Sequence, residues 1–211
     1  MAAKLFFILC FLIFTLDSPC AQEESEEISC PLWKMALLKK SGSAYESIAF
    51  RQSLTMTRRD VYQIYLAFEG EGYCYVVQED DEGRLPLVFR KTVSRGDRIN
   101  LPEQALREGT EEGRDFKAGD LPGTSRLYVV VSGQPRQHLE KLMEQHEKES
   151  SAIPLERSLL SEVLAIRRSL SSLPSAETSV PPAATDPAMK GQLWLFEGQD
   201  AWVVTITVRV Q

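Results

Sequence analysis

Histidine and concentrated positive charge are the two scarcest chemical features of this 211-residue chain. It has two histidines, and its 24 lysines and arginines are outnumbered by 30 aspartates and glutamates, which gives a net charge of −6. A protein that grips nucleic acid through its phosphates needs a concentrated basic face. We therefore expect no nucleic-acid partner.

The shortage of histidine also limits metal binding and catalysis. His138 and His146 stand eight residues apart in a predicted helix, roughly on one face, whereas the zinc motif HExxH places its histidines four apart. No CxxC pair and no metal-type Cys/His spacing occurs. We predict a solvated helix face for both histidines, no metal, no cofactor, no catalytic residues and no enzymatic activity.

Two further patterns resemble ligand sites only superficially. The acidic run Glu79–Glu82 lacks the alternating ligands and the later bidentate Glu of a calcium loop, so we interpret it as a solvated turn. The glycines between Gly96 and Gly123 are scattered through a charged segment and form no phosphate-binding motif before a helix.

The longest apolar run is too short to cross a membrane. Lys4 is followed by Leu5–Leu16, which has the length of a secretory signal core and falls short of a bilayer of about 30 Å. We predict a signal peptide over residues 1–21 and export to the periplasm, the outer envelope or the extracellular space.

Two processing routes are open for this segment. Ordinary cleavage falls after Cys20 or Ala21. In the other route Cys20 is lipidated, and the acidic stretch Gln22–Glu27 serves as a tether and gives the only membrane attachment. Pro19 and Asp17 depart from the usual lipoprotein signal, which favours plain secretion.

Cys30 and Cys74 remain in the exported chain. An oxidising compartment permits a disulfide between them, which would close a loop of roughly 45 residues and contribute about 3–4 kcal/mol. The alternative is two unrelated buried thiols, one in an N-terminal arm and one in a strand. The residues leave both readings open.

Most of the exported chain has strand character. Alternating β-branched and aromatic residues predict strands, and the acidic turn with Gly83 predicts a hairpin whose second strand, because of Pro86, lies at an edge or beside a bulge. The predicted strands are 61–68, 73–78, 84–90, 98–101, 126–131, 192–196 and 201–210. The last two are expected to form an antiparallel hairpin through Glu197–Asp200. Tyr73, Tyr75 and Trp202 are interpreted as core residues rather than interface residues.

Two helices are predicted at 135–148 and 154–170, each with apolar residues at intervals of three or four on one face. They should pack on the sheet or on each other. Residues 171–190 are rich in Ser, Ala and Pro, which predicts a disordered loop. Residues 22–45 are interpreted as an N-terminal arm, and 46–211 as a single domain. The predicted fold class is α+β, a mainly antiparallel β-sandwich-like sheet with two helices inserted before the C-terminal hairpin.

The order of glycines and apolar runs suggests a relationship. The segments are Gly72–Val77, the turn with Gly83, Leu85–Phe89, Arg98–Pro102 and Gly123–Ser132. Over roughly residues 45–145, and as far as the C-terminal strand, this order resembles the bacterial family called domain of unknown function 4384. The resemblance implies a β-rich module of bacterial envelope or extracellular proteins, with no site residue to carry over. Cys74 stands where that family usually has an aliphatic residue, and the segment between the last strands is longer here.

Three hypotheses for function follow. The first is an exported, non-enzymatic module that binds an unidentified envelope protein, with a sheet edge as its contact. The second is an accessory subunit of an envelope enzyme or transport assembly that docks through the 171–190 loop. The third is a hydrolase whose carboxylates are Asp97, Asp115 and Asp120.

Overall fold

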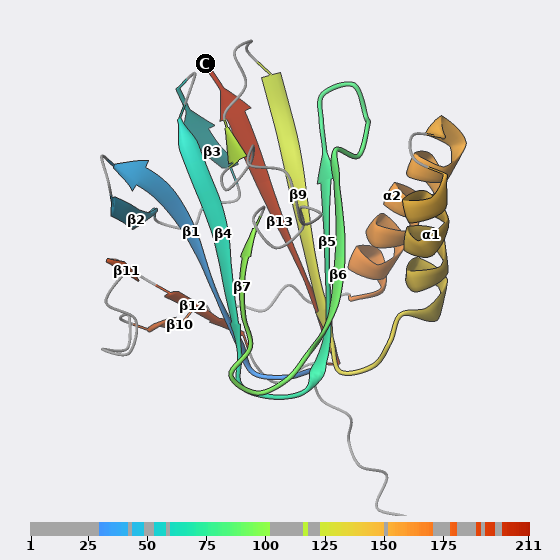
Figure 1. Cartoon of the computed structure of the whole chain (residues 1–211), viewed down its shortest axis with the longest axis horizontal. Coiled ribbons are helices and arrows are strands. Elements are labelled where there is room, and N and C mark those ends of the chain that lie inside the picture. Colours follow the sequence, from blue (N-terminus) through green and yellow to red (C-terminus); the bar gives the residue numbers. More distant parts are fainter. Residues whose placement is uncertain are drawn as a thin grey trace, which may run out of the picture.

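The computed structural model describes residues 30–41, 44–48, 53–57, 60–101, 116–117, 123–149, 152–170, 178–180, 189–190, 193–196 and 200–211. The predicted signal peptide, Cys20, Asp115 and Asp120 lie outside these residues. The described residues form an α+β fold in three layers, two β-sheets and a pair of helices (Figure 1). This confirms the predicted fold class.

The first sheet is built around two long antiparallel strands, β1 (Trp33–Ser41) and β4 (Val61–Phe68). The other side of β1 pairs with two strands in succession, and so does the other side of β4. The flanking strands are β2 (Ala44–Ile48) and β12 (Leu193–Phe196) beside β1, β7 (Arg98–Leu101) and β8 (Phe116–Lys117) beside β4, and, further out, β10 (Thr178–Val180) on β12 and β11 (Met189–Lys190) on β2.

The second sheet has five strands in the order β3–β13–β9–β5–β6. Their bounds are β3 (Ser53–Met56), β5 (Gly72–Glu79), β6 (Leu87–Val93), β9 (Gly123–Ser132) and β13 (Ala201–Val210). All neighbours are antiparallel except β3, which runs parallel to β13. The predicted β5–β6 hairpin is confirmed, and Gly83 in its turn has a φ of 75°.

An inter-sheet core fills the space between the two sheets. Trp33 of β1 stacks on Phe68 of β4 with ring centroids 6.4 Å apart, and β5, β9 and β13 supply alternate apolar residues from the opposite sheet. Burial of these faces is the main favourable term in the folding of the sandwich.

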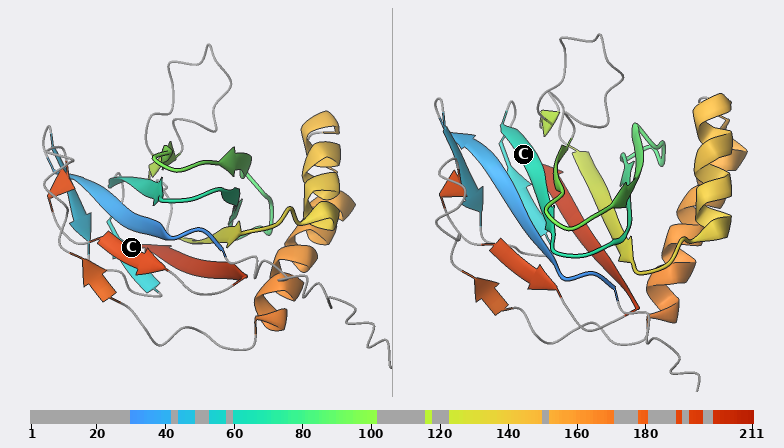
Figure 2. Two further views of the ribbon diagram at one scale, coloured as in Figure 1. Left: turned by 90° about the horizontal axis from the view of Figure 1, so that it is seen from below. Right: turned by 60° about the horizontal axis from the view of Figure 1, so that its bottom comes forward.

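The helices α1 (Gln137–Lys148) and α2 (Ile153–Ser169) cover the outer face of the second sheet, on the side away from the first sheet (Figure 2). Leu139 and Met143 of α1, with Leu159 and Val163 of α2, pack on the strands and on each other. This confirms the predicted helices and their packing, and it defines a second, helix-side core.

Three features differ from the sequence predictions. The C-terminal strands do not form a hairpin, because β12 pairs with β1 in the first sheet while β13 pairs with β9 and β3 in the second. The predicted N-terminal arm contains β1, a central strand whose residues 35–38 are buried on both faces. Within 171–190, the described residues are the strands β10 and β11, whose backbones pair with the flanks of the first sheet.

Candidate functional site

The β5–β6 hairpin joins an unpaired strand edge to the helix layer. β6 is the last strand of the second sheet, and among the described residues it pairs with β5 alone. It runs for seven residues, longer than β3, the strand at the opposite end of the same sheet. Pro86 precedes it directly, as the sequence predicted for an edge strand. No other described strand pairs with its outward backbone groups, and such edge groups are what an added strand binds.

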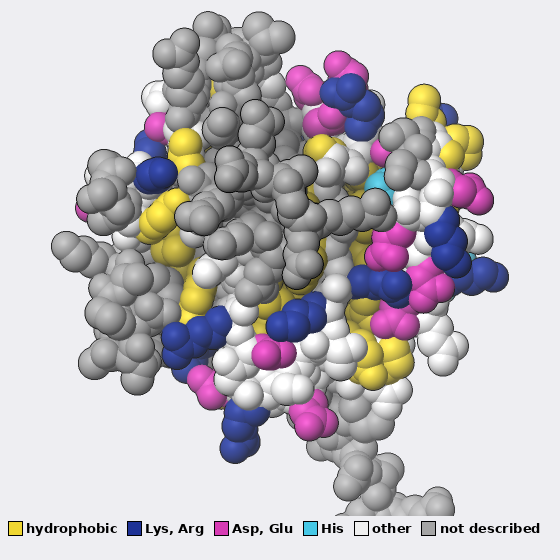
Figure 3. Space-filling view, in the orientation of Figure 1, with side chains coloured by type: hydrophobic (Ala, Val, Ile, Leu, Met, Phe, Trp, Pro, Cys, Tyr) yellow, Lys and Arg dark blue, Asp and Glu magenta, His cyan; other side chains and the backbone are white. Residues whose placement is uncertain are grey.

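Arg90 connects this edge strand to α1. Its guanidinium donates to Glu144 at 3.0 Å and to Glu147 at 3.2 Å. Burial alone would lower the pKa of Arg90, but the hydrogen bonds to these two carboxylates raise it. Figure 3 shows Lys and Arg side chains lying among Asp and Glu side chains where β6 meets the helices. Positive and negative charges balance one another here, so the β6 edge carries no strong electrostatic field of its own.

Tyr75 fixes the start of α1 against the sheet. Its hydroxyl donates to Glu140 at 2.9 Å and accepts a hydrogen bond from the backbone N–H of Arg136 at 3.0 Å. Arg136 is the N-cap residue and makes no side-chain cap hydrogen bond, and the Tyr75 hydroxyl satisfies the Arg136 backbone N–H, one of the donors that a helix start leaves unpaired. Burial raises the pKa of Tyr75, and the Glu140 carboxylate raises it further. The phenol therefore keeps its proton.

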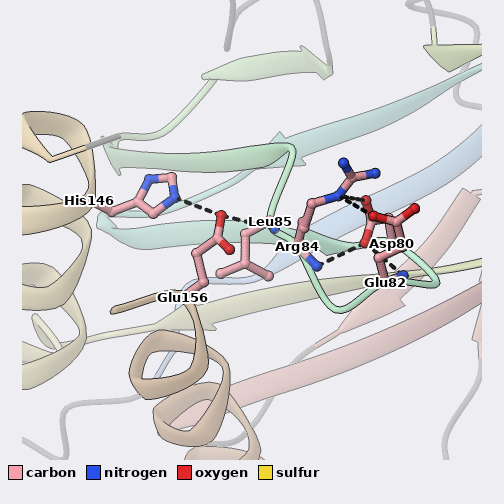
Figure 4. A network of polar contacts seen from close by, with 6 residues as sticks. All are labelled: Asp80, Glu82, Arg84, Leu85, His146 and Glu156. Carbon is pink, nitrogen blue, oxygen red and sulfur yellow. Dashed lines mark hydrogen bonds and ion pairs between the residues drawn. The ribbon is translucent and has the colours of Figure 1, made fainter. Parts of the chain in front are cut away.

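The turn of the β5–β6 hairpin is held both by contacts within the turn and by a contact to α2 (Figure 4). Asp80 accepts from the backbone N–H groups of Arg84 and Glu82 at 2.8 and 3.0 Å, and its other oxygen pairs with the Arg84 guanidinium at 2.8 Å. Next along the chain, the Leu85 N–H donates to the buried Glu156 of α2 at 3.4 Å. His146 of α1 lies 3.7 Å from the same Glu156 oxygen.

These contacts settle the sequence predictions for the histidines and the acidic run. Asp81 and Glu82 lie in an exposed turn, as predicted, and Asp80 organises that turn. The prediction is wrong for Glu79, which is the last residue of β5 and accepts hydrogen bonds from Arg126 and Tyr128. His138 is solvated, as predicted, but His146 is not, since it lies largely buried between the helices. Within the part of the chain that the structure describes, no group of three or more His, Cys, Asp and Glu side chains could hold a metal ion.

A small hollow lies beside the edge, between β5, β6 and the first turn of α1. Its volume is about 230 Å³, and its lining residues are Tyr73, Tyr75, Arg90, Lys91, Thr92 and Glu140. This is below the ~300 Å³ at which small-molecule sites usually begin, and it suits a single side chain. No local sequence pattern predicts this hollow, because its lining residues come from three elements that meet only in the folded protein.

The three aromatic residues interpreted as core residues have different outcomes. Tyr75 belongs to the helix-side core and Trp202 to the inter-sheet core, which agrees with that interpretation, whereas Tyr73 is half-buried in the wall of the hollow.

The remaining candidate residues lie elsewhere. Asp97 accepts from the Ser94 N–H at 3.0 Å in an exposed turn, and this hydrogen bond holds the pKa of its carboxyl below the usual range. Cys30 and Cys74 are buried in the inter-sheet core with their thiols unbridged. No helix in the described part of the chain is long and apolar enough to cross a membrane.

The described residues define an α+β sandwich with an edge strand, β6, that is braced by a helix pair. No family model, curated protein or solved structure matches the chain. The resemblance to domain of unknown function 4384 therefore remains a prediction from the residues that suggested it.

Proposed function

We propose that this protein is an exported, non-enzymatic bacterial module that binds an envelope or secreted protein by adding a strand of the partner to β6. The observation that carries the proposal is the seven-residue edge of β6, paired on one side only among the described residues and lying beside a hollow. In strand addition, backbone hydrogen bonds give affinity, and pockets for alternate side chains give specificity.

The geometry suits this mode of binding. Side chains alternate along an added strand, so every second one would lie over the helix face of the sheet, where the hollow opens. Tyr73 offers an aromatic wall there, and the charged lining residues are Arg90, Lys91 and Glu140. Both cations are already paired with carboxylates, Arg90 with Glu144 and Lys91 with Asp97. An apolar or hydrogen-bonding partner side chain fits this lining better than a strongly charged one.

The bracing of the hairpin favours affinity as well. Arg90 is bound to α1, and Leu85 to α2, so β6 is already held in the conformation that an added strand requires. A preformed edge loses less conformational entropy on binding than a flexible one.

Site-specific photocrosslinking in the native cell tests the proposal. The photoreactive residue replaces Thr92, which is exposed on β6, and the matched control carries it at Ser161, exposed on α2. We expect one protein crosslinked from Thr92, through one extended segment of its chain, and no such product from Ser161. Equal products from both positions, or lipid and sugar adducts alone, would contradict the proposal.

The second candidate is an accessory subunit that docks through residues 171–190. The observation that favours it is the pairing of β10 and β11 with strands at the flanks of the first sheet, far from β6. Replacing residues 181–188 by a Gly/Ser linker of equal length separates the two. Loss of partner binding in this variant, with no protein crosslinked from Thr92 in the unaltered chain, would favour docking through the loop.

A further inference from the structure

Cys30 and Cys74 lie at the same end of the inter-sheet core, although they are far apart along the chain. Cys30 comes just before β1 of the first sheet, and Cys74 lies on β5 of the second. Both side chains are buried, at 4% and 0% exposure, in the same cluster of core residues.

The path of the chain brings the two residues together. The Glu69 N–H donates to the Leu32 carbonyl at 2.8 Å, which holds the segment before β1 beside the end of β4. Pro31 then lies directly on β5, because a Cβ added to Gly72 would stand 2.7 Å from the Pro31 Cγ. Only glycine permits this approach.

Gly72 and Cys74 are two residues apart on one strand, so their side-chain directions share a face. Cys74 belongs to the inter-sheet core, so that face is the inner one. Cys30 is bonded to Pro31, the residue that covers Gly72, and therefore enters the core next to Cys74. The pKa values agree with this proximity: burial is the largest cause that raises the pKa of Cys74, and the Cys30 thiolate raises it further.

We propose that Cys30 and Cys74 form a disulfide that fastens the first sheet to the second at this end of the sandwich. The inference rests on the export part of the proposed function, because only an oxidising compartment keeps such a bond. The Sγ–Sγ bond forms as the two thiols lose two protons and two electrons. The electrons go to the disulfide of a thiol-exchange protein or of oxidised glutathione, which becomes two thiols.

The bond has to form before the core closes. Burial raises the pKa of Cys30 to about 12, with a smaller lowering by Arg136, and burial raises that of Cys74 as well. Exchange requires a thiolate, so the folded, reduced protein should react slowly and the unfolded chain quickly. Once formed, the bond ties the N-terminal segment, with any tether that precedes it, directly to the core.

Two separate measurements test whether the Cys30–Cys74 disulfide, here called the staple, forms and whether the protein reaches an oxidising compartment. In the first, the purified protein is reduced, unfolded and refolded with oxidised glutathione, and its peptides are mapped by mass spectrometry. We expect a Cys30–Cys74 peptide pair and a melting temperature roughly 10 °C above that of the reduced protein. C30A, which removes one partner of the proposed bond, should show no difference between the two treatments. Alkylatable thiols at both positions after oxidative refolding would overturn the staple.

In the second measurement, cells that export the protein are quenched in acid and free thiols are blocked before reduction and labelling. We expect Cys30 and Cys74 to be labelled only after reduction. If the staple forms on refolding but both thiols are free in the cell, the export part of the proposed function fails and the staple's geometry stands.

Discussion

The two cores of this protein are built by different means. The inter-sheet core consists mainly of hydrocarbon and aromatic side chains from both sheets. The helix-side core has a similar apolar centre, but polar contacts join the sheet to the helices around its margins. These contacts are Tyr75 with Glu140 and Arg136, Arg90 with Glu144 and Glu147, and Leu85 with Glu156.

The two cores therefore have different roles: the inter-sheet core mainly stabilises the fold, and the helix-side core mainly sets the positions of the helices and the hairpin. Apolar burial is non-directional and roughly proportional to area, so the inter-sheet core holds the sandwich together without fixing fine geometry. Hydrogen bonds and ion pairs are directional, so the helix-side contacts set where α1 and α2 lie and how the β5–β6 hairpin is held. We infer that the second core serves the β6 edge.

The largest loss is expected in the inter-sheet core. Phe68→Ala removes a buried ring that stacks on Trp33, and it should lower the free energy of unfolding by about 3–5 kcal/mol. Ile153→Ala, at a 60% exposed position, is the control and should change it by no more than about 0.5 kcal/mol. Urea denaturation measures both. Similar values for the two variants would contradict the assigned core.

A smaller loss is expected at the α1–α2 interface. Glu156→Ala leaves the Leu85 N–H without its acceptor and removes the neighbour of His146, which should destabilise the protein by about 2 kcal/mol. Glu156→Gln keeps an acceptor oxygen and should lose less than half of that. Hydrogen exchange should show faster exchange in 80–86 for the Ala variant. An equal loss in both variants would mean that the hydrogen bond to Leu85 contributes little.

Tyr75→Phe removes one hydroxyl and keeps the ring. Because that hydroxyl accepts from Arg136 and donates to Glu140, we expect a loss of about 1–2 kcal/mol with faster exchange at the start of α1. Tyr128→Phe is the matched comparison and should cost about 1 kcal/mol or less, because among the described residues the Tyr128 hydroxyl bonds to Glu79 only. Unchanged exchange in α1 would show that Tyr75 does not anchor the helix.

The smallest effect is expected at the hairpin turn, and it depends on pH. Burial of Asp80 opposes its ionisation, but hydrogen bonds from Arg84 and Glu82 lower its pKa in the folded state. A lowered folded-state pKa adds stability that is complete above the unfolded value of about 3.9 and is lost as pH falls through the folded value. Asp80→Asn should therefore cost about 1 kcal/mol at pH 7, and the difference from wild type should shrink below about pH 4. A difference that does not vary with pH would contradict this.

Local patterns were sufficient for much of the fold. The alternation in 201–210 predicted β13, and the apolar spacing in 154–170 predicted α2. Gly83 and the acidic turn predicted the β5–β6 hairpin, and Pro86 predicted an edge. In each case the information lies within a few neighbouring residues.

What the sequence could not supply depends on pairing between distant segments. Residues 35–38 of β1 are buried on both faces, so this apolar run has no alternation that would predict a strand, and it was interpreted as part of an N-terminal arm. β12 and β13 are separated by four residues, which suggested a hairpin, yet the two strands pair in different sheets. The hollow and the burial of His146 arise only where separate elements meet. The candidate site was therefore predictable only as an edge strand.

Whether a partner adds a strand to β6 is best measured by amide hydrogen exchange of the complex identified by crosslinking. We expect alternate amides of Leu87–Val93, those that point away from β5, to become protected in the complex, while amides of α2 and of 178–190 exchange as in the free protein. Protection confined to α2 or to 178–190, with β6 unchanged, would contradict strand addition to β6.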